Sequence, residues 1–340
     1  MSSSQAPRVE RWVDQGGKDY LGEALAGLLA ERKRLPAKLL YDEMGSRLFQ
    51  HITELREYYP TRTEIELLRR MGPVLGELLP PGLAVVEYGA GSERKAEILL
   101  GSLRSPRAYI GIDIAAGVLE ASIVRLKLRF PSLIIQAMVA DFVNPTGLPS
   151  QIRDLARLGF FPGSTIGNMD PSEATAFLGR TRRLLGTTSW FLVGVDLRKD
   201  PAILVPAYDD GEGITAAFNR NMLVRLNREG DANFDPEAFT HVALWNDVES
   251  RIEMHLVSRR PQIVSFLGHQ IRFLAGESIH TENSYKHTVD GFRALAKAGG
   301  WEPRELWTDP DDLFSVHLLQ AGVSHGQPGQ TDSGHARAPT

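Results

Sequence analysis

Cysteine is absent from the 340 residues of this chain. Without a thiol, the protein has no disulfide, no thiolate metal site and no cysteine nucleophile. The sequence also has no apolar run approaching the ~20 residues that a membrane-spanning helix needs. Its polar start, residues 1–5, lacks the apolar core of a signal peptide. We therefore expect a cytoplasmic protein with no membrane partner.

A strong basic charge is missing as well, since the formal net charge is −4. This balance gives no electrostatic reason to expect a nucleic acid or an anionic membrane as partner. The length of 340 residues allows one large domain or two of ordinary size. The histidines show no compact metal-ligand spacing, so we expect no metal, and a metal held by His280 and His287 is the weaker alternative.

A short apolar run followed by a glycine turn is the most informative stretch of the chain. Residues 83–86 read as a buried parallel strand, Gly89 and Gly91 bracket a tight turn, and a helical pattern begins near Lys95. Together they form the ligand-binding corner of a doubly wound α/β sheet. Arg94 replaces the third glycine of the dinucleotide fingerprint, which favours another nucleoside-bearing cofactor over nicotinamide or flavin. A turn without a ligand is the simpler alternative.

Polar side chains follow successive strands of this sheet. Asp113 stands 24 residues after Gly89, where an acid accepts hydrogen bonds from ribose hydroxyls. Asp141 and Phe142 follow the third strand and suit the amine and the ring face of a base. Each acid alone would also fit a helix cap or a loop, but the carboxyl ends of parallel strands share one edge. We predict strands at 83–88, 108–112, 133–139, 159–161 and 190–195, and helices at 94–103 and 117–130.

Asn168 lies in a glycine-flanked turn after the fourth strand. If the first three strands bind the nucleoside, this side chain faces the reactive end of the cofactor; otherwise it is an ordinary turn residue. Asp170, Pro171 and Glu173 then fit the cap, the first position and the third position of a helix.

The remaining parts of the chain have a different pattern. Near the start, a helical pattern covers 20–33, and a further helix follows Tyr58, with Thr61 or Thr63 as its cap and Glu64 in its first turn. An α+β insertion runs from 199 to about 285, and the stretch 276–287 leads from it to a helix. We predict helices at 203–208, 214–228 and 288–298, hairpins at 240–258 and 263–274, and sheet strands at 301–307 and 313–319.

Several motifs together point to one family. The chain resembles the S-adenosylmethionine-dependent L-histidine Nα-methyltransferases of ergothioneine biosynthesis over about residues 20–320. The resemblance implies a Rossmann-like class I methyltransferase sheet with a second, discontinuous α+β substrate-recognition domain. The motifs are at 39–42, 57–64, 163–168, 207–210, 215–221 and 251–254. The implied domains are 61–198 with 287–321 for the cofactor and 10–60 with 199–286 for the substrate, between disordered tails at 1–9 and 322–340.

The resemblance also assigns roles to individual residues. Asn168 and Tyr208 are expected to hold the α-amine and the carboxylate of histidine, with a backbone contact from Gly163. Asn168 is the expected catalytic residue, and Tyr41, Tyr58 or a water is expected to help the amine lose its proton. The S-adenosylmethionine contacts are expected to be Gly89, Lys95, Asp113, Asp141 and Phe142; the imidazole contacts are Tyr58, Glu282 and Ser284, and Phe49, Met254 and Tyr41 line the same pocket.

The implied reaction is three successive methylations of L-histidine to hercynine by a monomer. Methyl transfer is a direct displacement that requires no metal, which agrees with the absence of a metal motif. Asn283 departs from the family pattern, because the mycobacterial member has valine at this position. Residues 285–287 also differ in part. The alternatives are an N-methyltransferase for another amine such as tryptophan, a nicotinamide oxidoreductase, and a non-catalytic nucleoside-binding module.

Overall fold

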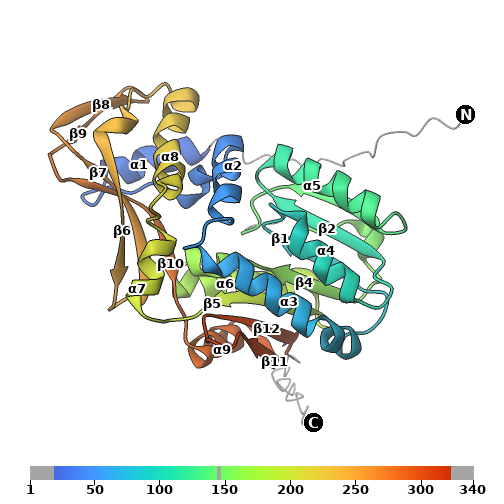
Figure 1. Cartoon of the computed structure of the whole chain (residues 1–340). Coiled ribbons are helices and arrows are strands. Elements are labelled where there is room, and N and C mark those ends of the chain that lie inside the picture. Colours follow the sequence, from blue (N-terminus) through green and yellow to red (C-terminus); the bar gives the residue numbers. More distant parts are fainter. Residues whose placement is uncertain (1–18, 144–146, 323–340) are drawn as a thin grey trace, which may run out of the picture.

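The computed structural model describes residues 19–143 and 147–322 (Figure 1). Its larger part is built on a seven-stranded sheet in the order β11-β12-β5-β4-β1-β2-β3. Strands β1 to β5 are parallel to one another, and β12 and β11 add an antiparallel edge, so all the predicted sheet strands are confirmed. They are β1 (Ala84–Tyr88), β2 (Ala108–Asp113), β3 (Ile134–Val139), β4 (Arg157–Phe161), β5 (Trp190–Asp196), β11 (Trp301–Thr308) and β12 (Phe314–Ala321).

Helices cover both faces of this sheet. On one face, α3 (Tyr59–Leu78), α4 (Glu93–Ser102) and α5 (Ala116–Arg129) share a buried core with Val85 of β1. On the other, α6 (Pro171–Leu185) and α9 (Val289–Ala298) share a core with Val86. Successive strand residues thus face opposite layers, which is why the parallel strands read as continuous apolar runs. Of the short 3-10 helices, η2 (Ser150–Ile152) lies between β3 and β4, and η3 (Thr165–Asn168) lies between β4 and α6.

A second body has its own core beside the sheet (Figure 1). In it, a three-stranded sheet with the order β10-β7-β6 packs against helices of the N-terminal segment and of the stretch 201–238. This shared core supports the proposed pairing of 10–60 with 199–286. Its elements are α1 (Asp19–Leu29), η1 (Ala37–Leu40), α2 (Glu43–Ile52), α7 (Pro201–Leu204), η4 (Val205–Ala207), α8 (Ile214–Gly230), η5 (Pro236–Ala238), β6 (Phe239–Asn246), β7 (Arg251–Ser258), β8 (Gln262–Phe266), β9 (His269–Phe273) and β10 (Ser278–Tyr285).

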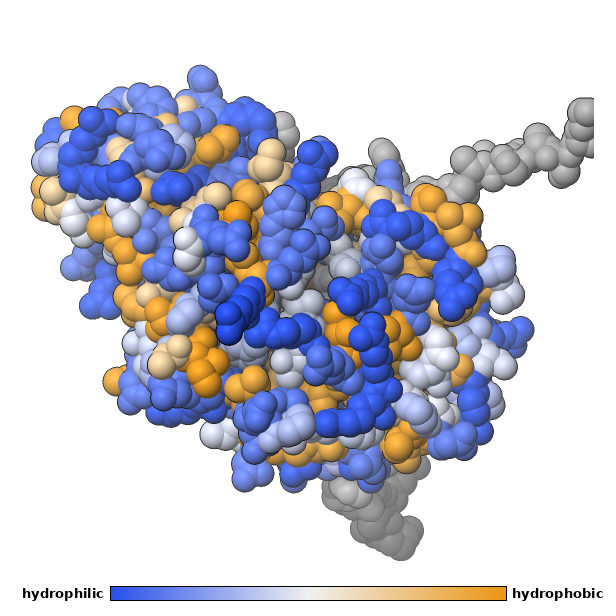
Figure 2. Space-filling view, viewed as in Figure 1, coloured by the Kyte–Doolittle hydropathy of each residue, from blue (hydrophilic) through white to orange (hydrophobic). Residues whose placement is uncertain are grey.

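The surface agrees with this division into buried cores. Figure 2 shows hydrophilic residues over most of the visible face, with hydrophobic residues in scattered patches. Within 19–143 and 147–322, no helix is both long and apolar enough to span a membrane. The predicted tails at 1–9 and 322–340 lie outside the described residues, apart from Gly322, as does the start of the predicted substrate domain before residue 19.

The structure adds one strand that the sequence pattern does not show. The stretch 276–287 contains β10, whose residues are mostly polar and therefore carry no alternating apolar signal. Pairing with β7 supplies its backbone hydrogen bonds. On its other side, Leu35 N donates to the His280 carbonyl at 2.9 Å, and His280 N donates to the Lys33 carbonyl at 2.9 Å. The helix predicted over 20–33 therefore ends at Leu29, because the following segment pairs with β10 instead.

The predicted helix after Tyr58 is confirmed as α3, but its predicted cap, Thr61 or Thr63, is wrong. The helix begins at Tyr59 with Tyr58 as its N-cap, so Thr63 lies inside it and donates to the Tyr59 carbonyl at 2.9 Å. Pro60, fixed near helical φ and lacking an N–H, fits this first turn. Glu64 consequently lies beyond the first turn and is buried rather than stabilising the helix terminus. The Asp170 cap is confirmed, with a complete capping box to Glu173.

A buried acid in β1 gives the fold a pH dependence. Burial raises the pKa of Glu87 from 4.5 to about 8, even though Tyr109 donates a hydrogen bond to it at 2.6 Å. Between these two pH values the unfolded chain releases the proton and the folded chain keeps it, so this group costs stability as pH rises. We expect the free energy of unfolding of Glu87→Gln, relative to that of the wild type, to increase between pH 5 and pH 8 by an amount on the order of several kcal/mol. Urea unfolding at both pH values measures this, and a difference that stays constant with pH would contradict it.

Candidate active site

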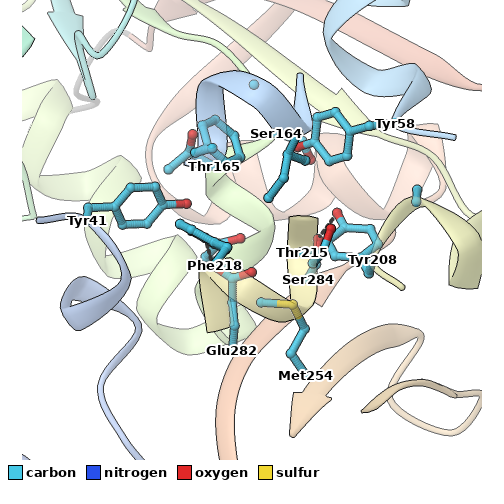
Figure 3. Close-up of a pocket in the computed structure, with 15 residues that line it drawn as sticks. Tyr41, Tyr58, Ser164, Thr165, Tyr208, Thr215, Phe218, Met254, Glu282 and Ser284 are labelled. Carbon is cyan, nitrogen blue, oxygen red and sulfur yellow. Dashed lines mark hydrogen bonds between the residues drawn. The ribbon is translucent and has the colours of Figure 1, made fainter. Parts of the chain in front are cut away.

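A pocket lies where the two bodies meet (Figure 3). It brings together residues from α2, the β4–α6 loop, α8, β7 and β10, which are far apart in the sequence. All the substrate residues expected from the resemblance line it. The lining comprises Tyr41, Phe49, Ile52, Tyr58, Gly163, Ser164, Thr165, Asn168, Ala207, Tyr208, Thr215, Phe218, Met254, Glu282 and Ser284.

Asn168 is held against Glu282 by the loop after β4. Ser164 adopts a left-handed conformation with φ 57, and its hydroxyl accepts from Asp196 N at 2.9 Å. Gly167 packs so closely on β10 that an added Cβ would lie 2.8 Å from the Tyr285 carbonyl oxygen. At the end of this loop Asn168 Nδ2 donates to Glu282 Oε1 at 3.0 Å. The expected amine contact and the expected imidazole contact are therefore direct neighbours.

Glu282 has an unusual charge state for a glutamate. Burial raises its pKa from 4.5 to about 7, although Lys286 and the Asn168 hydrogen bond oppose this. The side chain is buried, and its carboxyl group points into the pocket (Figure 3). Near neutral pH it is therefore able both to accept a hydrogen bond as a carboxylate and to donate one as an acid.

A fully buried lysine lies behind Tyr208 and Ser284. Lys286 Nζ contacts the Tyr208 hydroxyl at 2.7 Å and Ser284 Oγ at 2.8 Å, and those two hydroxyls are 2.7 Å apart. The same ammonium pairs with Asp196 at 2.8 Å. Two hydroxyls backed by an ammonium form a site suited to an anion such as a carboxylate.

Asp196 is the anchor of this buried charge network. Besides Lys286, it accepts from Lys199 Nζ at 2.6 Å and from the Tyr59 hydroxyl at 2.8 Å. Burial alone would raise the Asp196 pKa, but the two ammonium groups hold it below its ordinary value. Burial also lowers the pKa of Lys199 to about 8. Sequence reasoning named none of these three ionic residues as part of the site.

A signal for Lys286 did exist in the sequence. Glu282, Ser284 and Lys286 alternate, which is the spacing of residues on one face of a strand. The alternation indicates a shared face only if this stretch is a strand, and the sequence pattern did not predict β10. Thr215 and Phe218 lie in the 215–221 motif, but no individual role was given to them.

Aromatic side chains form the wall of the pocket nearest the N-terminal segment. Tyr41 contacts Phe49 and Phe218 edge-on, with ring centroids 5.8 and 5.6 Å apart. Tyr58 contacts Phe49 at 6.0 Å and Tyr208 at 6.2 Å. Burial, together with neighbouring acids and phenols, raises the pKa of Tyr41 and Tyr58 well above the usual value. Both are neutral phenols, so any help they give with a proton is limited to hydrogen bonds of a hydroxyl.

The carboxyl ends of β1, β2 and β3 form the predicted cofactor edge. Gly89 has φ 78, which favours glycine, and a Cβ placed there would lie 3.8 Å from the Phe142 ring. A Cβ on Gly91 would lie 3.8 Å from the Asp113 carboxylate. Asp141 accepts from Val143 N at 2.9 Å. Phe142 and Asp113 thus lie beside one glycine turn, with Asp141 next to Phe142 in the chain, which fits a nucleoside that must approach the backbone closely.

Asp113 and Lys95 complete this edge. Burial raises the Asp113 pKa to about 6, and the side chain accepts from Ala115 N at 2.8 Å. Lys95 forms an ion pair with Glu64, which also accepts from Gly163 N at 2.8 Å. Glu64 reaches this position because Gly194 leaves room: a Cβ there would lie 2.0 Å from the carboxylate. Lys95 therefore links the cofactor edge to the Gly163 loop of the pocket.

The family model of the histidine-specific, SAM-dependent methyltransferases matches residues 21–321. The chain belongs to this family. The histidine N-alpha-methyltransferase of Mycolicibacterium smegmatis is 42% identical over 314 residues, covering 90% of this chain and 96% of that protein. The protein of the same name from Mycobacterium tuberculosis is 39% identical, covering 90% of this chain and 96% of that protein.

Family membership decides among the classes considered above. A SAM-dependent methyltransferase is neither a nicotinamide oxidoreductase nor a non-catalytic nucleoside-binding module. A more distant relative bears on the tryptophan alternative. The 4-dimethylallyltryptophan N-methyltransferase of Claviceps purpurea is 25% identical to this chain, covering 88% of this chain and 94% of that protein. S-adenosylmethionine is the methyl donor of the family, and the glycine turn with its acidic and aromatic neighbours fits it.

Proposed function

We propose that this enzyme methylates the α-amine of L-histidine three times, giving hercynine. The observation that carries the proposal is the pair of half-buried Asn168 and buried Glu282, 3.0 Å apart, beside the anion site of Tyr208, Ser284 and Lys286. An amino acid with a polar ring needs three recognition points, one for each charged or polar group. The pocket offers an amide, a carboxyl group and an ammonium-backed hydroxyl pair for these.

In this proposal each end of histidine has a defined partner. Tyr208 donates to the α-carboxylate, and Lys286 acts as a positioning residue through that hydroxyl. The carbonyl oxygen of Asn168 accepts from the α-amine and directs its lone pair, while the amide N–H bonds Glu282. Glu282 accepts from an imidazole N–H. Ser284, the other expected imidazole contact, is also bonded to Tyr208 and Lys286, which leaves its hydroxyl one further hydrogen-bonding site for the ring.

The chain contributes orientation to the reaction. S-adenosylmethionine would supply an electrophilic methyl group, which passes to the neutral amine as the S–CH₃ bond breaks and S-adenosylhomocysteine leaves. Holding two reacting groups in place is a large part of such catalysis. Gly89, Lys95, Asp113, Asp141 and Phe142 are the proposed cofactor contacts. Tyr41 and Tyr58, as neutral hydroxyls, are proposed to pass the amine proton toward solvent.

Mass spectrometry of the products tests the reaction. Incubating the enzyme with S-adenosylmethionine and histidine should give additions of one, two and three methyl groups. A parallel incubation with tryptophan should give none. If tryptophan is methylated and histidine is not, the substrate assignment is wrong. Calorimetry with S-adenosylhomocysteine checks the cofactor edge independently, because binding there needs no substrate.

Replacing Tyr208 with phenylalanine tests the carboxylate contact. We expect KM for histidine to rise roughly 10-fold or more with a smaller change in kcat, since a hydrogen bond to a charged group is worth about 1.5–3 kcal/mol. Steady-state kinetics with histidine and with histamine, which lacks the carboxylate, measure it. The variant should discriminate less between the two amines than the wild type does. Equal discrimination would place the carboxylate elsewhere.

A further inference from the structure

A cluster of potential metal ligands lies on the opposite face of the strands that form the pocket. In β7, Met254 lines the pocket, so its neighbours Glu253 and His255 project from the other face. In β10, His280 is paired directly with His255. The sequence predicted no metal, with His280 and His287 as the weaker alternative; His287 instead packs on Phe292, with ring centroids 6.0 Å apart.

The three side chains have the geometry of a preformed site. One ligand atom from each of Glu253, His255 and His280 lies within 4.8 Å of the other two. His255 Nε2 and Glu253 Oε2 are already 3.2 Å apart, and the two imidazole rings have centroids 5.1 Å apart. The side chains of Glu253 and His255 are only 13% and 15% exposed. Two imidazoles and one carboxylate are the protein ligands of many open zinc sites.

Neighbouring residues leave the ligand atoms available. Glu253 is fixed through Oε1, which accepts from Arg251 Nε at 2.8 Å and Asn246 Nδ2 at 2.9 Å, so Oε2 faces the histidines. Among the residues that the structure describes, His280 Nε2 and His255 Nδ1 are buried without a hydrogen-bond partner.

Arg251 is the feature of this cluster that opposes a metal. Its guanidinium donates to Glu253 Oε1 and places a positive charge beside the site. The competing interpretation is therefore an ion-pair cluster of Arg251, Glu253 and His255 without a metal.

We propose that Glu253, His255 and His280 bind one divalent cation of the zinc class, with a fourth position open to solvent. This site is separate from the methyl-transfer pocket and independent of the proposed reaction. Nitrogen ligands exclude Mg²⁺ and Ca²⁺, which prefer all-oxygen sites. The site lies directly behind Met254 and next to the β10 irregularity between His280 and Glu282, so a bound ion would brace the strand that carries Glu282.

Zinc titration of the full chain tests the proposal. Competition against a chromophoric chelator should show one Zn²⁺ bound per chain in the wild type, and Mg²⁺ should not displace it. His255→Ala and His280→Ala should each weaken this binding at least 10-fold. The matched control is His269→Ala, which removes an exposed histidine of the neighbouring hairpin and should bind Zn²⁺ like the wild type. The chain has no cysteine, so competing thiolate binding is absent from all variants.

A second measurement separates metal loss from misfolding. Each variant should bind S-adenosylhomocysteine like the wild type, which shows that the sheet is intact. His255→Gln, which keeps a polar side chain in the cluster, is the alternative if His255→Ala does not fold. Co²⁺ in place of Zn²⁺ should give the visible absorption of a tetrahedral nitrogen and oxygen site. The proposal is overturned if folded double variants lacking both histidines bind as many zinc ions, equally tightly, as the wild type.

Discussion

Replacing Glu282 with alanine should lower kcat/KM for histidine roughly 10²-fold or more. In the proposed complex its carboxylate accepts an imidazole N–H inside a buried site. Removing the carboxylate leaves that N–H without a partner, a loss of about 1.5–3 kcal/mol for a charged hydrogen bond. The Asn168 amide N–H loses its hydrogen-bond acceptor as well. Sites that hydrogen-bond a polar substrate group reach discriminations of roughly 10⁴. Steady-state kinetics with histidine and with tryptophan as competing substrate measure the change.

Two further variants make the Glu282 experiment specific. Glu282→Gln keeps the volume and the carbonyl acceptor, so it should retain more activity toward histidine than the alanine variant. Glu249→Ala, at a half-exposed side chain in the β6–β7 turn, should behave like the wild type. S-adenosylhomocysteine affinity should be unchanged in all of them, which places the loss on the substrate side. If Glu282→Ala keeps histidine turnover within a few-fold, another residue recognises the ring.

Replacing Lys286 with methionine should have the largest effect on stability. Methionine fills similar space but leaves the fully buried Asp196 with one ammonium partner instead of two. Breaking a buried ion pair by removing one member costs about 3–5 kcal/mol, because the remaining charge keeps its desolvation penalty. Urea unfolding measures this loss. The variant should also bind histidine more weakly, since the hydroxyls of Tyr208 and Ser284 lose their cationic support.

Controls distinguish the lost charge pair from lost packing. The double variant Asp196→Asn with Lys286→Met removes both charges and should recover part of the stability. Lys297→Met, at an exposed position of α9, should change the free energy of unfolding by no more than about 0.5 kcal/mol. If Lys286→Met unfolds at the wild-type urea concentration, the buried pair contributes nothing net. If the folded variant keeps the wild-type KM for histidine, Lys286 has no positioning role.

Local patterns were sufficient for the central sheet. Its parallel strands are buried on both faces, so each is a continuous apolar run, and a glycine turn or an acid follows the strand end. Asp113, Asp141 and Phe142 were therefore predictable as neighbours at one edge from strand spacing alone. The Asp170 cap depended only on residues within one helical turn. The pocket residues were foreseen through the family motifs, and no local signal would have joined Tyr41 to Glu282.

The elements that local patterns missed depend on distant partners. Strand β10 has mostly polar residues, and it is extended because β7 and the segment at 33–35 satisfy its backbone hydrogen bonds. Once it is a strand, the alternation of Glu282, Ser284 and Lys286 places all three on one face. Glu64 is an ordinary helix residue by sequence, and only the space over Gly194 turns it toward Lys95 and Gly163.

The sequence by itself determined the fold class, the cofactor edge and the family of this enzyme, because these rest on runs of neighbouring residues and on specific motifs. Tertiary structure alone decided the contact between Asn168 and Glu282, the buried Lys286–Asp196 pair and the Glu253, His255 and His280 cluster. The first two join segments of the two bodies, and the third depends on the pairing of β7 with β10. Electrostatic effects such as the raised pKa of Glu282 follow from that burial, which no local pattern encodes.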